Sequence, residues 1–214
     1  MNRYILLSIQ VAAVALSAFL FASCDKDQKE TPLSLAVKQH TLTRKTGYGN
    51  DWVYYSFESG KEVQGINEEN RADRLDWDVA FNRYNNIRTN SGTSGKGKGG
   101  ARDMGKVAFK SVKVAPTDGY IVDRKDSIMY GLGTLLQGGQ AEMGPSTLNE
   151  VLKGAIVFSG PPPTYTMSEH VFVIKTANGK YVKMQVEGFH DKEGKSGYVA
   201  FRYVYQPDGS PKFE

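Results

Sequence analysis

Beyond residue 50, apolar and polar side chains alternate along much of the chain with a period of two, the pattern of β-strands. The stretch DWVYYSF (51–57) is rich in β-branched and aromatic residues and predicts one strand. LDWDVAFNRY (75–84) alternates more sharply, because its odd positions from 75 to 81 are apolar while Asp76, Asp78 and Asn82 are polar. We therefore expect a second strand with one buried face and one face in water.

The C-terminal third shows the clearest strand pattern. In VFVIKTANGKYVKMQVEGF (171–189), two alternating runs flank Asn178 and Gly179, the preferred residue pair for a two-residue type I′ hairpin turn. SGYVAFRYVYQ (196–206) follows as a third alternating run after a short charged loop. These three strands are predicted to form a meander.

Two further strands and one helix complete the predicted elements. KVAFKSVKV (106–114) and GYIVD (119–123) are predicted strands. PSTLNEVLKG (145–154) predicts one short helix with Ser146 as its N-cap and a glycine as its stop. The expected fold class is mainly β, with a single β domain over residues 35–214 and one or two short helices.

Two glycine-rich stretches interrupt this pattern. NSGTSGKGKGGARD (90–103) has no GxxxxGK[ST] register and no following helix, so we expect a long, mobile hairpin loop and no phosphate site. GLGTLLQGG (131–139) lacks the buried parallel strand and the later acidic residue that a nucleotide loop needs. It is interpreted as a flexible linker.

The first 23 residues predict a bacterial lipoprotein signal peptide. Arg3 precedes an apolar run from residue 5 to residue 20, and small residues lead into Cys24. An uncleaved membrane anchor is the weaker alternative, because a spanning helix needs about 18 apolar residues. We expect Cys24 to be lipidated as the mature N-terminus, and residues 24–34 to be a charged, flexible tether.

Composition narrows the function classes. Cys24 is the only cysteine, so a secreted domain of this length must be held together by its core and not by disulfides. Arg3 is the only charged residue before Cys24, so the mature chain has 26 basic and 23 acidic side chains and a net charge of +3. That mild charge, without a clustered basic face, argues against a nucleic-acid partner.

No catalytic constellation can be recognised. The three histidines, His40, His170 and His190, are too scattered for a three-histidine zinc centre. The chain has no GxSxG nucleophile motif, and Asp76 and Asp78 are expected on the wet face of a strand. The sequence therefore predicts a protein that is not an enzyme.

Methionines gather in the segment 127–171, which holds half of the six methionines in the chain. Met129 lies in an apolar run, where a methionine usually fills a gap in the core. Met143 and Met167 lie among polar and turn residues, in AEMGPS and YTMSEH, and are expected in loops. Polar neighbours of this kind are not typical of a buried methionine, so we expect another role for both residues.

Several stretches together resemble one family. The lipobox-like leader, WDVAFNRYNNIRTNSGTSG, PPPTYTMSEHVFVIKTANGKYVKMQV and GYVAFRYVY resemble the HmuY family of haem-binding lipoproteins. The resemblance covers nearly all of the mature chain. It implies a mostly β fold in which two projecting β thumbs grip one haem b (iron protoporphyrin IX). It also implies a lipid anchor in the outer membrane, display at the cell surface or release, and delivery of haem to a TonB-dependent outer-membrane receptor, with host haem proteins as a possible source.

The resemblance also suggests the iron ligands. The founding member uses two histidines, whereas relatives use two methionines, and Met143 and Met167 occupy the corresponding positions. His170 and Met129 are the alternatives. Tyr165 and Thr166 are expected to contact the cofactor, with Leu135, Leu136 and Phe158 as further apolar walls.

A second function class stays open at this stage. The chain could be a β-rich surface lipoprotein that binds a partner without haem, through the 90–103 loop. Indifference to haem and loss of the partner contact on deletion of that loop would distinguish this alternative.

Overall fold

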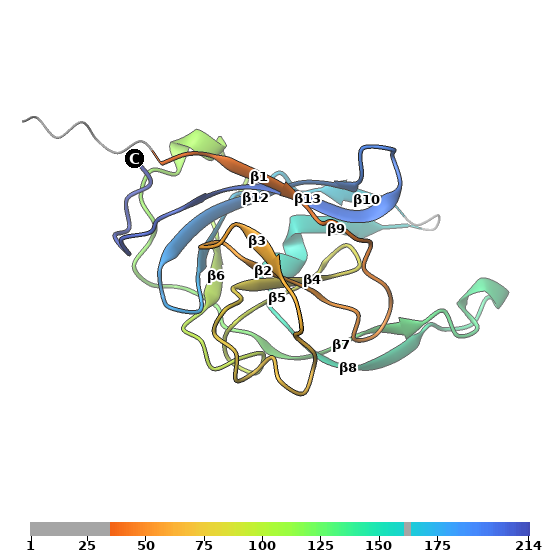
Figure 1. Cartoon of the computed structure of the whole chain (residues 1–214). Helices are drawn as coiled ribbons and strands as arrows, with labels where there is room; N and C mark the ends of the chain where they lie inside the picture. Colours follow the sequence, from red (N-terminus) through yellow and green to blue (C-terminus); the bar gives the residue numbers. More distant parts are fainter. Residues whose placement is uncertain (1–34, 161–163) are drawn as a thin grey trace, which may run out of the picture. The chain divides into compact units, whose positions relative to one another are not determined.

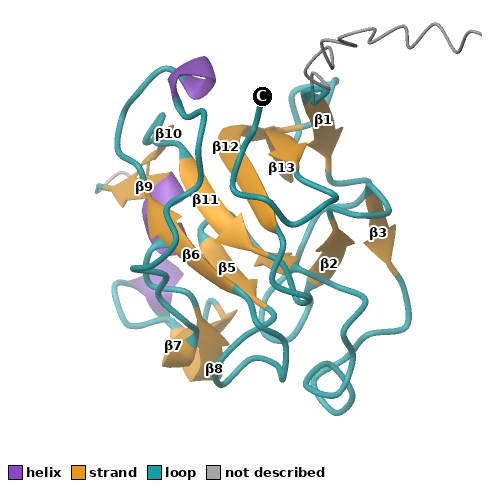
Figure 2. Ribbon diagram, turned by 90° about the vertical axis from the view of Figure 1, so that its left-hand side faces the viewer, coloured by secondary structure: helices purple, strands orange, loops and turns teal. Residues whose placement is uncertain are grey.

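Two antiparallel sheets form the body of the protein in the computed structural model, which describes residues 35–160 and 164–214 (Figures 1 and 2). The larger sheet has the strand order β1 (Lys38–Thr41), β13 (Ser196–Tyr205), β12 (Tyr181–His190), β11 (Phe172–Lys175) and β6 (Gly100–Asp103). The smaller sheet has the order β3 (Lys61–Val63), β2 (Val53–Ser56), β4 (Val79–Asn82) and β5 (Asn86–Thr89).

Two separate hairpins complete the strands. One joins β7 (Arg124–Gly131) to β8 (Glu142–Leu148), and the other joins β9 (Ile156–Ser159) to β10 (Thr164–Met167). In Figure 1 the β7–β8 hairpin extends well beyond the sheets. Three short 3-10 helices, η1 (Phe109–Ser111), η2 (Leu135–Gln137) and η3 (Leu152–Ala155), are the helices of the described residues. The mainly β fold class, with projecting hairpins, is therefore confirmed.

The core lies between the two sheets, and smaller apolar clusters cover their outer faces. In β11, Phe172 and Ile174 point into the central cluster, while Val173 joins an outer cluster with Phe109 and Phe213. Strands with both faces buried carry nearly continuous apolar runs, because successive side chains point to opposite faces.

The central strand β4 departs from the predicted wet face for the same reason. Val79 and Phe81 enter the core, while Ala80 packs in an outer cluster with Trp52 and Trp77. Asp78 and Asn82 are buried as well. The expectation that Asp78 and Asn82 face water was wrong, because backbone groups of other segments pair with them. The amides of Phe57 and Ala177 donate to Asp78, and the Asn82 side chain donates to the carbonyls of Gly49 and Asp51.

The predicted meander is confirmed, but its first turn differs. β11 pairs with β12, and β12 with β13. Gly179 has φ of +84°, whereas Asn178 is not among the residues with positive φ. A type I′ turn needs positive φ at both positions, so the connection is a longer loop in which the Gly179 amide donates to the Thr176 carbonyl.

Two predicted strands and most of the predicted helix are wrong. Residues 106–114 contain η1, since Phe109 and Val112 are three positions apart and both pack on the outer face of the larger sheet. Residues 119–123 make only an isolated bridge, between Ile121 and Ala101. The segment 145–154 is divided between β8 and η3, because its first residues pair with β7.

The 90–103 segment is packed, contrary to the expected mobile loop. Asn90 is fully buried, and its side-chain amide donates to the carbonyls of Arg74 and Trp77. The Gly99 amide donates to the Asn90 carbonyl at 3.1 Å. The loop on which the adhesion alternative depended is therefore not a free surface loop.

Residues 131–139 are also ordered differently from the expected linker. They form the tip of the β7–β8 hairpin, where the amides of Gln137 and Gly139 both donate to the Thr134 carbonyl. The predicted signal peptide, Cys24 and the 24–34 tether lie outside the described residues, and so do Pro161–Pro163.

Candidate functional site

The two projecting hairpins and the β4–β5 turn enclose a cleft of about 450 Å³. Leu132, Leu135 and Leu136 line it from the tip of the β7–β8 hairpin. Phe158 and Tyr165 line it from the β9–β10 hairpin. This volume lies within the about 300–1,000 Å³ typical of small-molecule sites, and the walls are mainly apolar, as such sites require.

Two methionines stand on one wall of the cleft. Met129 in β7 and Met143 in β8 are direct cross-strand partners, and both line the cleft. Met143 is 55% exposed, which is unusual for a methionine. Both lie in strands, so the expectation of a loop for Met143 was wrong, although the alternation of β8 still directs its thioether outward.

Aromatic side chains form the opposite wall. Tyr165 lies with its ring centroid 4.3 Å from that of Tyr84 and 5.3 Å from that of Phe158. Phe189 supports both tyrosines from behind, at 5.0 Å from Tyr84 and 5.9 Å from Tyr165. Because Tyr165 also packs against the central core, this wall is held by the body of the protein.

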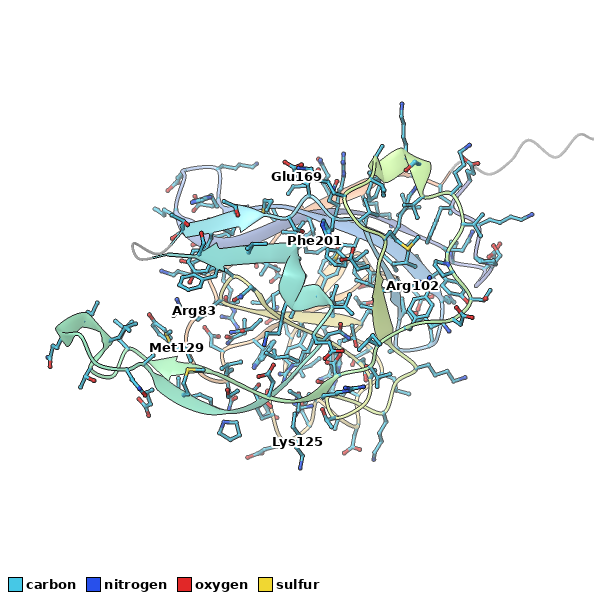
Figure 3. The ribbon with its side chains drawn as sticks, turned by 180° about the vertical axis from the view of Figure 1, so that it is seen from behind. Arg83, Arg102, Lys125, Met129, Glu169 and Phe201 are labelled. Atoms are coloured by element: carbon cyan, nitrogen blue, oxygen red, sulfur yellow. The ribbon has the colours of Figure 1, made fainter. Side chains whose placement is uncertain are left out.

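A cation stands between the two walls. Arg83 lies in the β4–β5 turn and lines the cleft, and Figure 3 shows it between the β7–β8 hairpin and the β9–β10 hairpin, close to Met129. Its Nη1 donates to the Met129 Sδ at 3.8 Å, and its guanidinium lies 4.0 Å from the centroid of the Tyr48 ring. Within the described residues, Arg83 forms no ion pair with a carboxylate.

The other predicted site residues lie away from the cleft lining. Met167 ends β10 opposite Ile156 and is half-buried against the core, so the expectation of a loop position not suited to burial was wrong for it. It lines a different cavity, together with Phe109. Thr166 is exposed, and strand alternation puts it on the opposite face of β10 from Tyr165. His170 is held by Asp103, with 2.8 Å between Nδ1 and Oδ2.

The structure thus brings Met129, Met143 and Tyr165 together with the expected apolar walls, and adds two residues that the sequence analysis missed. Arg83 and Tyr84 lie in NRYNN, which was interpreted as the end of a strand. An arginine followed by an aromatic residue inside a cluster of asparagines is a turn pattern. That pattern could have drawn attention to them.

Within residues 35–160 and 164–214, no group of three or more His, Cys, Asp or Glu side chains is arranged to hold a metal ion. Among the helices described, none has the length and apolar character to cross a membrane.

The fold and the cleft define a β-sheet protein with a candidate ligand site between two projecting hairpins. Residues 49–203 match the sequence profile of one family, described as HmuY protein. Since the match covers well over half of the chain, the protein belongs to the HmuY family. No curated protein sequence matches the chain significantly.

Solved structures share this fold. Apo PinO from Porphyromonas gingivitis matches with a TM-score of 0.63 and 20% identity, over 79% of this chain and 97% of that chain. The apo HmuY analog TFO from Tannerella forsythia has a TM-score of 0.62 and 22% identity, over 80% and 96%. A candidate HmuY-like heme binding protein from Bacteroides vulgatus has a TM-score of 0.59 and 21% identity, over 80% and 92%.

Proposed function

We propose that this protein binds one haem b in the cleft between the β7–β8 and β9–β10 hairpins. The observation that carries the proposal is the pairing of an exposed methionine, Met143, with a cleft whose walls are apolar and aromatic. A porphyrin is a broad apolar disc that needs such walls, and its iron accepts thioether sulfur as a ligand. Membership of the HmuY family and the similarity to a candidate heme binding protein support the same ligand.

Met143 would hold the iron from the β7–β8 wall. Met129 stands beside it on the same wall, whereas two axial ligands must approach iron from opposite sides of the macrocycle. The second ligand is therefore proposed to come from β10. Met167 shares with Tyr165 one face of that strand, and Tyr165 already lines the cleft. Since Met167 lies outside the cleft lining, its participation requires a shift of the β9–β10 hairpin on binding.

Thioether ligation fits a preference for reduced haem. Sulfur of this kind is a soft ligand that favours ferrous over ferric iron and raises the reduction potential relative to imidazole. The protein itself contributes the sulfur atoms, the apolar walls and the exclusion of water. A role in binding and transfer is proposed, not catalysis.

The cellular role proposed is haem acquisition. Cys24 would carry a lipid that anchors the protein in the outer membrane, at the cell surface or in a released form. From there it would take haem from its surroundings, including host haem proteins, and pass it to a TonB-dependent receptor. A candidate lipoprotein from Bacteroides fragilis shares the fold, with a TM-score of 0.57, which is consistent with such an anchor.

A visible spectrum tests the binding proposal. The full-length protein is mixed with haemin, and absorption is recorded before and after reduction with dithionite. We expect a shifted Soret band, and sharp six-coordinate low-spin bands that are stronger in the reduced state. An unchanged haemin spectrum in both states would overturn the proposal.

A further inference from the structure

A second, smaller cavity opens beside the cleft. It has a volume of about 110 Å³ and is lined by Lys45, Thr46, Gly47, Tyr48, Arg83 and Tyr84. Arg83 and Tyr84 also line the large cleft, so the two spaces meet at these residues. The volume equals that of about three or four water molecules in the liquid, which suits a small polar group on a short stem and not a second ring system.

The charged residues that line this cavity, Lys45 and Arg83, are both cations. Within the described residues, neither Lys45 nor Arg83 forms an ion pair. The carboxylate of Asp51 is already engaged, because it accepts hydrogen bonds from Arg44 and from the Gly47 amide. Two cations that border one cavity without a carboxylate between them favour an anionic ligand group there.

The backbone of Arg83 and the stem of Lys45 are held in place by the surrounding chain. Arg83 has φ of +53°, a conformation that L-residues adopt only where neighbours fix it, and the Thr46 hydroxyl donates to its carbonyl at 3.1 Å. The stem of Lys45 packs over Gly197, where an added Cβ would come within 2.6 Å of its Cγ. A site in which one cation has a fixed backbone and the other a packed stem loses less conformational entropy on binding than two free side chains would.

We propose that Lys45 and Arg83 form a carboxylate subsite that fixes the orientation of the macrocycle in the cleft. This proposal rests on the proposed function, because the carboxylates are the two propionate arms of haem. The ring would lie against the apolar walls, and at least one arm would enter the small cavity. Arg83, at the boundary, would place its guanidinium on the carboxylate, for which its planar donors are well suited.

The experiment compares haemin with haemin dimethyl ester, which has the same ring and iron but no carboxylate charge. Both are titrated in one detergent buffer into the full-length wild-type protein, R83Q, R83K and K45Q, and Kd is measured from the absorption change. R124Q and K125Q serve as matched controls, since both residues are exposed on β7, neither lines the cleft, and Lys125 lies away from Arg83 and Met129 in Figure 3.

We expect the wild-type protein to bind haemin about tenfold or more tightly than the ester, the usual effect of a hydrogen bond to a charged group. R83Q and K45Q should lose most of this preference. Because Lys45 is not part of the large cleft lining, K45Q should also bind the ester almost as the wild type does. R83K should keep part of the preference, and the two controls should keep all of it. Because Lys45 is exposed, K45Q tests the subsite even if R83Q does not fold.

Equal wild-type affinity for the two ligands would overturn the subsite and leave haem binding intact. The same conclusion would follow if R83Q and K45Q weakened both ligands equally, or if they kept the full preference for haemin. Failure of the wild type to bind either ligand would overturn the proposed function, and the subsite with it.

Discussion

Met129 and Met143 are direct partners across the β7–β8 hairpin, and both side chains line the cleft. Directly opposed residues of an antiparallel pair have their Cβ atoms only about 4.5–5.5 Å apart and project to the same side. Two such sulfur atoms cannot reach an iron from opposite sides of a porphyrin. At most one of them could therefore hold the iron of the proposed haem. Met143 is the better candidate, because Met129 already accepts a hydrogen bond from Arg83.

Leucine substitutions test this assignment, since leucine keeps the volume of methionine and removes only the sulfur. We expect Met143→Leu and Met167→Leu each to abolish the six-coordinate low-spin bands of reduced haem. Each should also weaken ferrous haem binding by at least about tenfold. The measurement is the reduced absorption spectrum together with a titration of ferrous haem.

Met129→Leu and His170→Ala are the controls for that series. Met129→Leu changes the same wall, and His170 is paired with Asp103 outside the cleft, so both should keep the low-spin bands. Loss of the bands in His170→Ala with retention in Met167→Leu would replace the Met/Met site by a Met/His site. If Met129→Leu lost the low-spin bands and Met143→Leu kept them, Met129 and not Met143 would be the ligand from this wall.

Asp78 should make the folded protein less stable as the pH rises, which is the reverse of the usual effect of a carboxylate. Burial raises its pKa to about 6, although the amides of Ala177 and Phe57 donate to its carboxylate and oppose that rise. A pKa higher in the folded than in the unfolded state means that the folded protein holds the proton more tightly. The contribution of this group to the free energy of unfolding is therefore present below about pH 4 and is lost as the pH rises through 6.

Urea unfolding at pH 4 and at pH 7 measures this effect. Between pH 4 and pH 7, we expect the free energy of unfolding of the wild-type protein to fall by about 2–3 kcal/mol because of Asp78. The Asp78→Asn variant should not show this decrease. Asp76 provides a comparison of opposite sign, because its hydrogen bond from Arg74 lowers its pKa. If Asp78→Asn and the wild type had the same pH dependence, the buried carboxyl would not be the cause.

The strand pattern predicted those parts of the fold where alternation and burial agree. The meander of β11, β12 and β13 followed from alternation, even though β11 buries both faces. The segment 106–114 shows the limit of such a prediction. The spacing of Phe109 and Val112 among lysines fits both a strand and a tight turn. Only the face of the larger sheet against which they pack decides between these two structures.

The candidate site was predictable in composition but not in geometry. Met143, Leu135, Leu136 and Tyr165 meet in one cleft as expected. The cross-strand register that puts Met129 beside Met143 depends on the pairing of two segments 14 positions apart, which residue types do not specify. The place of Met167 at the end of β10, against the core, also follows from pairing. A thioether in a polar segment could equally have pointed into the cleft.

A buried cation is expected to need its carboxylate partner. Arg88 is fully buried, with its guanidinium 3.7 Å from the centroid of the Trp52 ring, and its Nη2 donates to Glu68. Burial opposes ionisation of Glu68, but hydrogen bonds and charge from Arg88 and Arg71 outweigh it and lower the pKa of Glu68. The ionised Glu68 therefore stabilises the folded protein at every pH above the ordinary pKa of a glutamate. This stabilisation is lost as the pH falls through the lowered pKa of Glu68.

Glu68→Gln should therefore destabilise the protein at pH 7 by about 1–3 kcal/mol, because a buried charge loses its compensation. Glu69→Gln is the matched control, since Glu69 is the exposed neighbour in sequence and forms no ion pair within the described residues. Urea unfolding of the two variants gives the comparison. Equal midpoints would show that water or another group compensates Arg88.

The packed 90–103 segment gives a prediction that separates it from a mobile loop. A Cβ added at Gly99 would lie 2.6 Å from the carbonyl oxygen of Asn90, a backbone atom that cannot move aside cheaply. Asn90 is tied to its surroundings, because its amide donates to the Asp78 carbonyl and its side chain donates to the carbonyls of Arg74 and Trp77. Overpacking of such a site typically costs about 1–3 kcal/mol.

Gly99→Ala should therefore lower the free energy of unfolding by about 1–3 kcal/mol. Gly154→Ala is the control, since nothing lies within 4 Å of its added Cβ, and an alanine in η3 should be neutral or slightly stabilising. Both are measured by urea unfolding at one pH. A mobile loop would tolerate Gly99→Ala within about 0.5 kcal/mol, as exposed positions do. That result would restore residues 90–103 as a free surface, and with it the adhesion alternative.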